Sequence, residues 1–94
     1  MESIETIKEK IVPVLKKHNV LKAAIFGSFV RGELTVNSDI DILVDMDNSK
    51  SLFDFIQLKL ELEEEINRRV DLVEYTNIYP MLRESIMREQ VPLL

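Results

Sequence analysis

The stretch FGSFVRGELTVNSDIDILVD, Phe26–Asp45, holds the strongest structural signal in the sequence. In its second half, Asp39 and Asp41 alternate with apolar residues in a segment that otherwise predicts a buried β-strand. Successive side chains of a strand point to opposite faces, so the two aspartates share one face and the isoleucines share the other. The strand is therefore expected to carry two neighbouring carboxylates on one face and an apolar surface on the other.

A third carboxylate occurs in a similar setting further along the chain. Asp71 lies among apolar residues in RRVDLVEY, which predicts another strand. If the two strands are neighbours, Asp39, Asp41 and Asp71 meet in one patch. Neighbouring carboxylates repel unless they are solvated, share a proton or hold a cation, and oxygen ligands suit Mg²⁺ or Mn²⁺ better than zinc. Three such acids can hold two metal ions for an in-line phosphoryl displacement.

The first half of the stretch offers a candidate site for phosphate. Gly27 permits close approach of the backbone after the strand that ends at Phe26, and Ser28 contributes a hydroxyl and a backbone N–H. We expect a short helix from Ser28 to Arg31. Its N-terminus would be a suitable place for phosphate, because helix N-termini bind anions. Arg31 is a further candidate contact for phosphate.

Each feature also has a purely structural interpretation. An Asp-x-Asp pair is common on an exposed sheet edge, Asp71 fits a solvated strand end, and an isolated Gly-Ser pair carries almost no information. Three acids within apolar strands, combined with the spaced Gly27–Ser28 pair, favour a functional site.

The remaining segments complete an α+β domain spanning residues 1–94. Apolar spacings of three and four predict a helix at the N-terminus, the segment LKAAIFG predicts a strand, and Ser51 is a candidate cap for a long helix reaching Asn67. A last helix is expected after Pro80, followed by an unpaired apolar tail, VPLL. The predicted order is helix, strand, short helix or turn, strand, helix, strand, helix.

Composition excludes several classes of function. The chain has 94 residues, a formal net charge of −5 and no cysteine, with His18 as its single histidine. Acidic chains lack the basic surface that binds nucleic acid or anionic membranes, and a cysteine-based or histidine-cluster metal site is impossible here. We find no apolar run long enough to span a membrane and no signal-peptide pattern, so a cytoplasmic location is expected.

The motif resembles that of a known enzyme group. Gly27–Ser28, ten intervening residues, and then Asp39-x-Asp41 are similar to the signature of the DNA polymerase β-like nucleotidyltransferase superfamily. The segments FGSFVRGE, SDIDILVD and VDLVEY resemble its smallest members, the minimal nucleotidyltransferases, over nearly the whole chain. This resemblance implies a small mixed sheet with helices packed on one face and the acidic face open.

The resemblance also implies a reaction and a partner. Asp39 and Asp41 would coordinate two Mg²⁺ ions, Gly27 and Ser28 would hold the triphosphate of ATP, and Asp71 would complete the metal site and help deprotonate the acceptor hydroxyl. Minimal members resemble antitoxins that transfer AMP to a tyrosine of a helical partner, a toxin of the higher-eukaryote-and-prokaryote nucleotide-binding (HEPN) type. A hetero-oligomer with such a toxin is therefore expected.

Two other functions fit the same sequence. The chain could neutralise its partner by binding alone, through the apolar stripes of the helix between Leu52 and Ile66 and through the C-terminal helix. Alternatively, it could be the catalytic subunit that modifies a hydroxyl of a small molecule, such as an antibiotic-like polyol.

Overall fold

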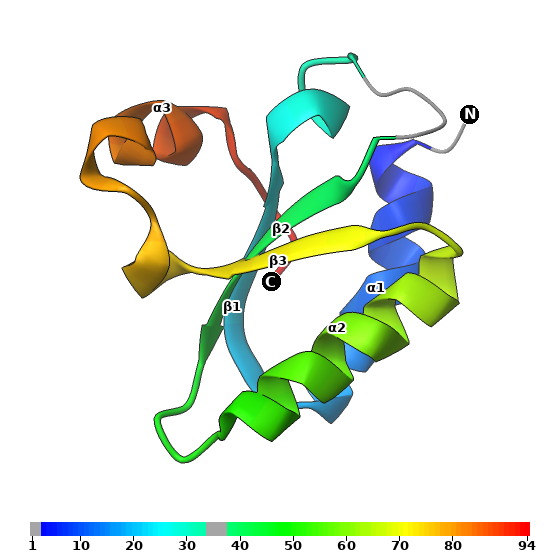
Figure 1. Ribbon diagram of the computed structural model, residues 1–94. Coiled ribbons are helices and arrows are strands. Elements are labelled where there is room, and N and C mark those ends of the chain that lie inside the picture. Colours follow the sequence, from blue (N-terminus) through cyan, green and yellow to red (C-terminus); the bar gives the residue numbers. More distant parts are fainter. Residues whose placement is uncertain (1–2, 34–37) are drawn as a thin grey trace.

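A computed structural model describes residues 3–33 and 38–94 of the chain. The strand that carries Asp41 is an inner strand of a four-stranded sheet. The strand order is β3-β2-β1-β4 (Figure 1). Along the chain the elements are α1 (Ile4–Lys17), β1 (Val20–Phe26), the 3-10 turn η1 (Gly27–Phe29), β2 (Ile40–Met46), α2 (Leu52–Ile66), β3 (Val70–Glu74), the 3-10 turn η2 (Tyr75–Asn77), α3 (Pro80–Glu89) and β4 (Val91–Pro92).

The sheet is mixed, because its strands pair in both senses. Strand β1 is antiparallel to β2 and to β4, whereas β2 and β3 are parallel. Parallel neighbours need a crossover connection, which α2 provides here between β2 and β3. The predicted fold class, α+β with a small mixed sheet, is confirmed.

The apolar face of β2 forms the centre of the main core. Ile40, Ile42 and Val44 are fully buried and belong to one cluster with side chains of α1 and α2. Figure 1 shows these two helices side by side on one side of the sheet. Their fully buried contributions to the cluster are Ile7, Ile11, Leu15, Leu58 and Leu62. Burying each such side chain stabilises the fold by roughly 1.5–3 kcal/mol, so this face holds the molecule together.

Both ends of α2 follow from local sequence chemistry. The Ser51 side chain accepts a hydrogen bond from the Asp54 backbone N–H, and the Asp54 side chain accepts one from the Ser51 backbone N–H. This capping box fixes the start of the helix where the sequence predicted it. Asn67 ends the helix in the left-handed conformation, which asparagine tolerates better than most residues.

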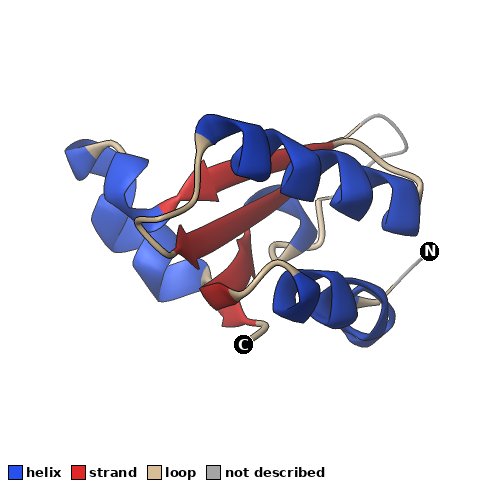
Figure 2. Ribbon diagram, turned by 90° about the horizontal axis from the view of Figure 1, so that it is seen from below, coloured by secondary structure: helices blue, strands red, loops and turns tan. Residues whose placement is uncertain are grey.

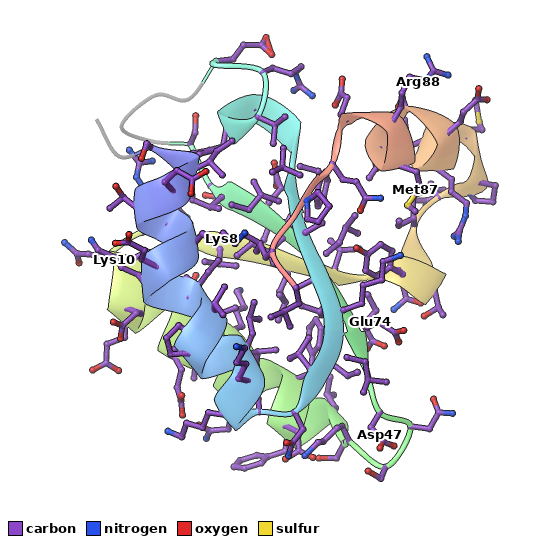
Figure 3. All side chains as sticks on the ribbon, turned by 180° about the vertical axis from the view of Figure 1, so that it is seen from behind. Lys8, Lys10, Asp47, Glu74, Met87 and Arg88 are labelled. Carbon is purple, nitrogen blue, oxygen red and sulfur yellow. The ribbon has the colours of Figure 1, made fainter. Side chains whose placement is uncertain are left out.

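The opposite face of the sheet has a smaller core beneath α3. Leu43, Tyr75 and Ile78 form a second buried cluster, against which Ile86 and Met87 of α3 pack. Figure 3 shows Met87 on the inner side of α3 and Arg88 pointing outward. Helix α3 therefore lies apart from α1 and α2, as Figure 2 also shows, and covers part of the face that carries Asp41. The expected packing of helices on one face thus holds for α1 and α2 but not for α3, whose apolar side chains cover Leu43 on the other face. No helix in the described ranges is long and apolar enough to cross a membrane.

The expectation of an unpaired C-terminal tail was wrong. Val91 and Pro92 pair with Ile25 and Ala24 of β1, and the backbone N–H of Leu93 donates to the carbonyl of Ala23 at 2.8 Å. The edge of β1 offers unpaired backbone groups, and an apolar segment that reaches it gains both hydrogen bonds and burial. Proline is tolerated because β4 is an edge strand.

This correction makes a prediction about two neighbouring leucines. Leu93 is 4% exposed, whereas Leu94 is 38% exposed. We expect Leu93→Ala to lower the free energy of unfolding in urea by about 2–3 kcal/mol, because it leaves a cavity in the core. Leu94→Ala is the matched control and should cost less than about 1 kcal/mol. Equal, small losses would show that the tail is not docked on β1.

Candidate active site

The register of the sheet places two of the predicted acids side by side. Asp41 of β2 pairs with Asp71 of β3 on one side and with Phe26 of β1 on the other. Residues directly opposite one another in a sheet share a face, so the three side chains form one row across it. The negative charge of Asp71 therefore acts directly on Asp41.

This proximity changes the acidity of Asp41. Burial raises its pKa to about 6, and the negative charge of Asp71, the hydrogen bond with Asp71 and the charge of Asp39 act in the same direction. The positive charge of Arg31 opposes them. At neutral pH the protein therefore holds a carboxylate pair whose repulsion is relieved by a proton or by a cation.

Asp39 lies directly before β2, where its side chain contacts an arginine. It precedes the first residue of β2, its side chain is 47% exposed, and its Oδ1 lies 3.7 Å from Nε of Arg69. Within residues 3–33 and 38–94, no three acidic, histidine or cysteine side chains converge closely enough to enclose a metal ion. Asp41 and Asp71 thus come together, while Asp39 lies near enough to raise the pKa of Asp41 but pairs with a guanidinium group. Repulsion among three carboxylates favours this arrangement.

The donor set nevertheless fits a hard divalent cation. Asp41 and Asp71 present oxygen ligands only. Burial is the main cause of the raised pKa of Asp41, and the negative charges of Asp71 and Asp39, which such a cation would neutralise, add to it. Asp39 can join them if its side chain leaves the exposed Arg69. The predicted metal ligands Asp39, Asp41 and Asp71 therefore stay a prediction that the chemistry of the residues supports.

The glycine turn lies directly against this pair. Gly27 has a φ of +79°, and a Cβ placed there would overlap the carboxylate of Asp41, lying 3.0 Å from its Cγ. The carbonyl of Gly27 accepts from the Arg31 N–H, and that of Ser28 accepts from the Glu33 N–H at 2.8 Å. The backbone of Gly27 therefore lies closer to the carboxylate of Asp41 than any residue with a side chain would allow. Ser28 follows directly in the chain.

The helix expected from Ser28 to Arg31 is instead the three-residue turn η1, Gly27–Phe29. The backbone N–H groups of Arg31, Gly32 and Glu33 donate to the carbonyls of Gly27, Phe29 and Ser28, respectively. These irregular turns end the segment without a regular α-helix. A single turn has little of the aligned dipole that makes a long helix N-terminus attract anions. Phosphate binding by Gly27 and Ser28 would accordingly depend on close approach to the backbone and on the serine hydroxyl.

Arg31 lies at the site but already has partners. Its Nη1 lies 3.0 Å from Oε2 of Glu89 in α3, and its Nε pairs with Glu33. The hydrogen bond to Glu33 is the main cause of the raised pKa of Arg31. Arg31 therefore links the glycine turn to the C-terminal end of α3, and its predicted contact with phosphate remains a prediction.

Two features of the site escaped the sequence analysis. Arg69 was not expected to pair with Asp39, although the RR pair preceding Val70 is a visible signal of positive charge beside the acidic strand. Phe26 was interpreted only as the end of a strand, yet it lies in the same row as Asp41 and Asp71. Its position could be inferred only once the pairing register was known.

Fold and site together define a nucleotidyltransferase. The family described as polymerase beta, nucleotidyltransferase matches residues 9–94, and this chain belongs to it. The resemblance noted from the Gly-Ser and Asp-x-Asp motif is thereby confirmed.

Two relatives within the nucleotidyltransferase family are named as protein adenylyltransferases. The chain is 48% identical to the candidate protein adenylyltransferase MJ0435 of Methanocaldococcus jannaschii, over 98% of this chain and 99% of that protein. It is 38% identical to protein adenylyltransferase MntA of Thermococcus cleftensis, over 97% of this chain and 90% of that protein. These alignments span the glycine turn and all three predicted acids.

Two solved structures share the fold. A candidate minimal nucleotidyltransferase superposes with a TM-score of 0.83 at 35% identity, covering 97% of this chain and 96% of that one. A chain from a toxin–antitoxin crystal structure with AMP-PNP superposes with a TM-score of 0.79 at 25% identity, covering 93% of this chain and 72% of that one.

The raised pKa of Asp41 predicts an unusual effect on stability. In the folded protein the charged form is disfavoured, so Asp41 destabilises the fold as the pH rises from about 4 to above 6. Asp41→Asn should therefore increase the free energy of unfolding in EDTA at pH 7 by about 1 kcal/mol, allowing for solvent screening, and should have no such effect at pH 3.5. Urea titrations at both pH values measure this. Asp45→Asn on the same strand is the control, and an equal gain from it would contradict the account.

The two glycines provide a second prediction, because both have positive φ. A Cβ at Gly27 would overlap Asp41, whereas one at Gly32 would meet nothing within 4 Å. Gly32→Ala should cost about 1 kcal/mol from backbone conformation alone, and Gly27→Ala about 2–4 kcal/mol because overlap is added. Chemical denaturation compares them. If the two variants lose the same stability, Gly27 is not pressed against the carboxylate.

Proposed function

We propose that this nucleotidyltransferase is the antitoxin of a toxin–antitoxin pair and transfers AMP from ATP to a tyrosine hydroxyl of a helical HEPN-type toxin. The observation that carries the proposal is the pairing of β2 with β3, which sets Asp41 beside Asp71 while Asp41 also lies against the backbone of Gly27. The adenylyltransferase names of the relatives support transfer of AMP to a protein. The toxin–antitoxin neighbour with AMP-PNP supports a nucleoside triphosphate and a partner toxin.

The reaction is an in-line displacement at phosphorus. The acceptor oxygen forms a bond to the α-phosphorus of ATP, the bond from that phosphorus to the bridging oxygen breaks, and pyrophosphate leaves with its electron pair. We assign Asp71 the role of accepting the hydroxyl proton, because it is the more exposed member of the pair and is open to an incoming acceptor. Gly27 and Ser28 hold the triphosphate through backbone and hydroxyl contacts.

A cation suits this arrangement. Mg²⁺ held by Asp39, Asp41 and Asp71 would neutralise the charge that develops on the phosphoryl oxygens. The chain's own contribution is to keep two carboxylates adjacent at the end of an apolar strand, where a formal net charge of −5 disfavours ATP without a cation.

Neutralisation by binding alone is a second candidate function, and one surface favours it. Helix α2 carries a row of exposed apolar side chains on the side away from the core, comprising Leu52, Phe53, Ile56 and Leu60. Exposed apolar patches of this kind are typical of protein interfaces. Both functions require a partner, so they differ only in whether the aspartates are needed.

The test is intact-mass analysis of the partner toxin after incubation with the protein, Mg²⁺ and ATP. We expect mass gains of whole AMP units, reduced about a hundredfold or more in rate by Asp41→Asn, the usual loss when a charge-stabilising group is removed. EDTA should abolish the gain. Asp45→Asn, an exposed aspartate on the same strand, is the matched control and should retain activity.

The two candidate functions then separate clearly. If Asp41→Asn still binds and neutralises the toxin while no AMP is added by either protein, the antitoxin acts by binding alone. A mass gain that survives Asp41→Asn would contradict the assignment of this site.

A further inference from the structure

A groove on the open face of the sheet begins at the row of carboxylates. Its volume is about 280 Å³, and Asp71 lies at its edge. Phe26 and Val73 line it from the sheet, and Leu82 and Ile86 line it from α3. Because Phe26 pairs with Asp41, which pairs with Asp71, the groove adjoins the reacting end of the site.

The groove is separate from the glycine turn. Neither Gly27 nor Ser28 lines it, and no lysine or arginine among the described residues does so. A triphosphate is strongly anionic, and the groove presents no cationic side chain among the described residues but does present the carboxylate of Asp71. We therefore assign the nucleotide's phosphates to the glycine turn and a different occupant to the groove, which meets that turn at Phe26.

The lining specifies the chemistry of the occupant. The polar side-chain groups that line the groove are the Asp71 carboxylate, the Asn77 amide and the Tyr79 hydroxyl, and its other side chains are aliphatic or aromatic. A tyrosine side chain has a flat apolar ring and one polar end, which matches an apolar groove with a carboxylate at its edge. An adenine ring has polar atoms around its periphery that one amide and one hydroxyl would leave partly unpaired, and a serine side chain is too short to fill the groove.

The mouth of the groove is exposed and apolar. Tyr79 is 76% exposed and Leu82 is 54% exposed, and both lie at the beginning of α3. Helix α3 has no fully buried residue, although Ile86 and Met87 pack inward (Figure 3). An apolar rim continuous with a catalytic site is expected to be covered by the acceptor when the acceptor binds.

We infer that this groove binds the acceptor side chain of the partner, an aromatic hydroxyl, with its ring between Phe26 and Leu82 and its oxygen at Asp71. The inference rests on the proposed function and adds the residues that select the acceptor. The phenolic proton passes to Asp71 as the phenolic oxygen bonds to the α-phosphorus and pyrophosphate departs. Tyr79 and Leu82 determine specificity for an aromatic acceptor over an aliphatic one.

The test uses N-acetyltyrosinamide as the probe and the full chain saturated with Mg²⁺ and α,β-methylene-ATP, because AMP-PNP keeps the bond between the α-phosphorus and its bridging oxygen that transfer of AMP breaks. Methyl NMR of isotopically labelled Val, Leu and Ile side chains reports binding without any turnover. We expect the probe to shift the methyl signals of Val73, Leu82 and Ile86, and N-acetylserinamide at the same concentration to leave them unchanged. The α,β-methylene-ATP alone should shift the amide signals of Gly27 and Ser28 but not those methyl signals.

Two variants make the test specific. Leu82→Ala should raise the dissociation constant for N-acetyltyrosinamide by about tenfold, the effect expected for losing part of one apolar contact. Met81→Ala is the matched control, because Met81 is 94% exposed on the same helix and does not line the groove. Both variants should bind α,β-methylene-ATP as the unmodified chain does.

The possible results distinguish the two proposals. If α,β-methylene-ATP binds at Gly27 and Ser28 but N-acetyltyrosinamide leaves the groove signals unchanged, or Leu82→Ala binds it normally, the groove is not the acceptor site and the proposed function stands. Shifts of the groove methyl signals by α,β-methylene-ATP would assign the groove to the base and overturn the inference. If α,β-methylene-ATP does not bind at all, that result contradicts both the proposed function and the inference that rests on it.

Discussion

The contact between Asp41 and Asp71 in adjacent parallel strands is the constraint on which the rest of the site depends. Two adjacent ionised carboxyl groups are unfavourable for folding at neutral pH, and burial, the largest cause of the raised pKa of Asp41, adds to the cost. A protein keeps such a pair only if the surrounding structure holds it in place. Here the parallel pairing of β2 with β3 does so, together with the glycine whose backbone lies against Asp41.

The stability needed to hold this pair comes from the other side of the same strand. Ile40, Ile42 and Val44 are fully buried beneath α1 and α2, so β2 is anchored by its apolar face while its opposite face carries Asp41. Further along that opposite face, Leu43 joins the small cluster beneath α3. One strand thus separates a structural core from a polar site, and α3 borders the site without closing over it.

The sequence predicted the features that depend on local periodicity. Alternation in SDIDILVD identified the two faces of β2, and Ser51 marked the start of α2, because both signals arise within a few residues. The features it missed arise from contacts between distant segments. The pairing of β4 with β1, the ion pair of Asp39 with Arg69 and the groove between Phe26 and Leu82 all depend on register and packing. The turn at Gly27 was located correctly but expected to form a longer helix.

The central claim is that the carboxylate pair is a cation site, and proton release on metal binding tests it most directly. Calorimetric titration of Mn²⁺ in buffers of different ionisation enthalpy counts the protons released. With the pKa of Asp41 at about 6, we predict release of most of one proton at pH 5.5 and of almost none at pH 8. Binding with no proton release at pH 5.5, or no saturable binding at either pH, would contradict the account.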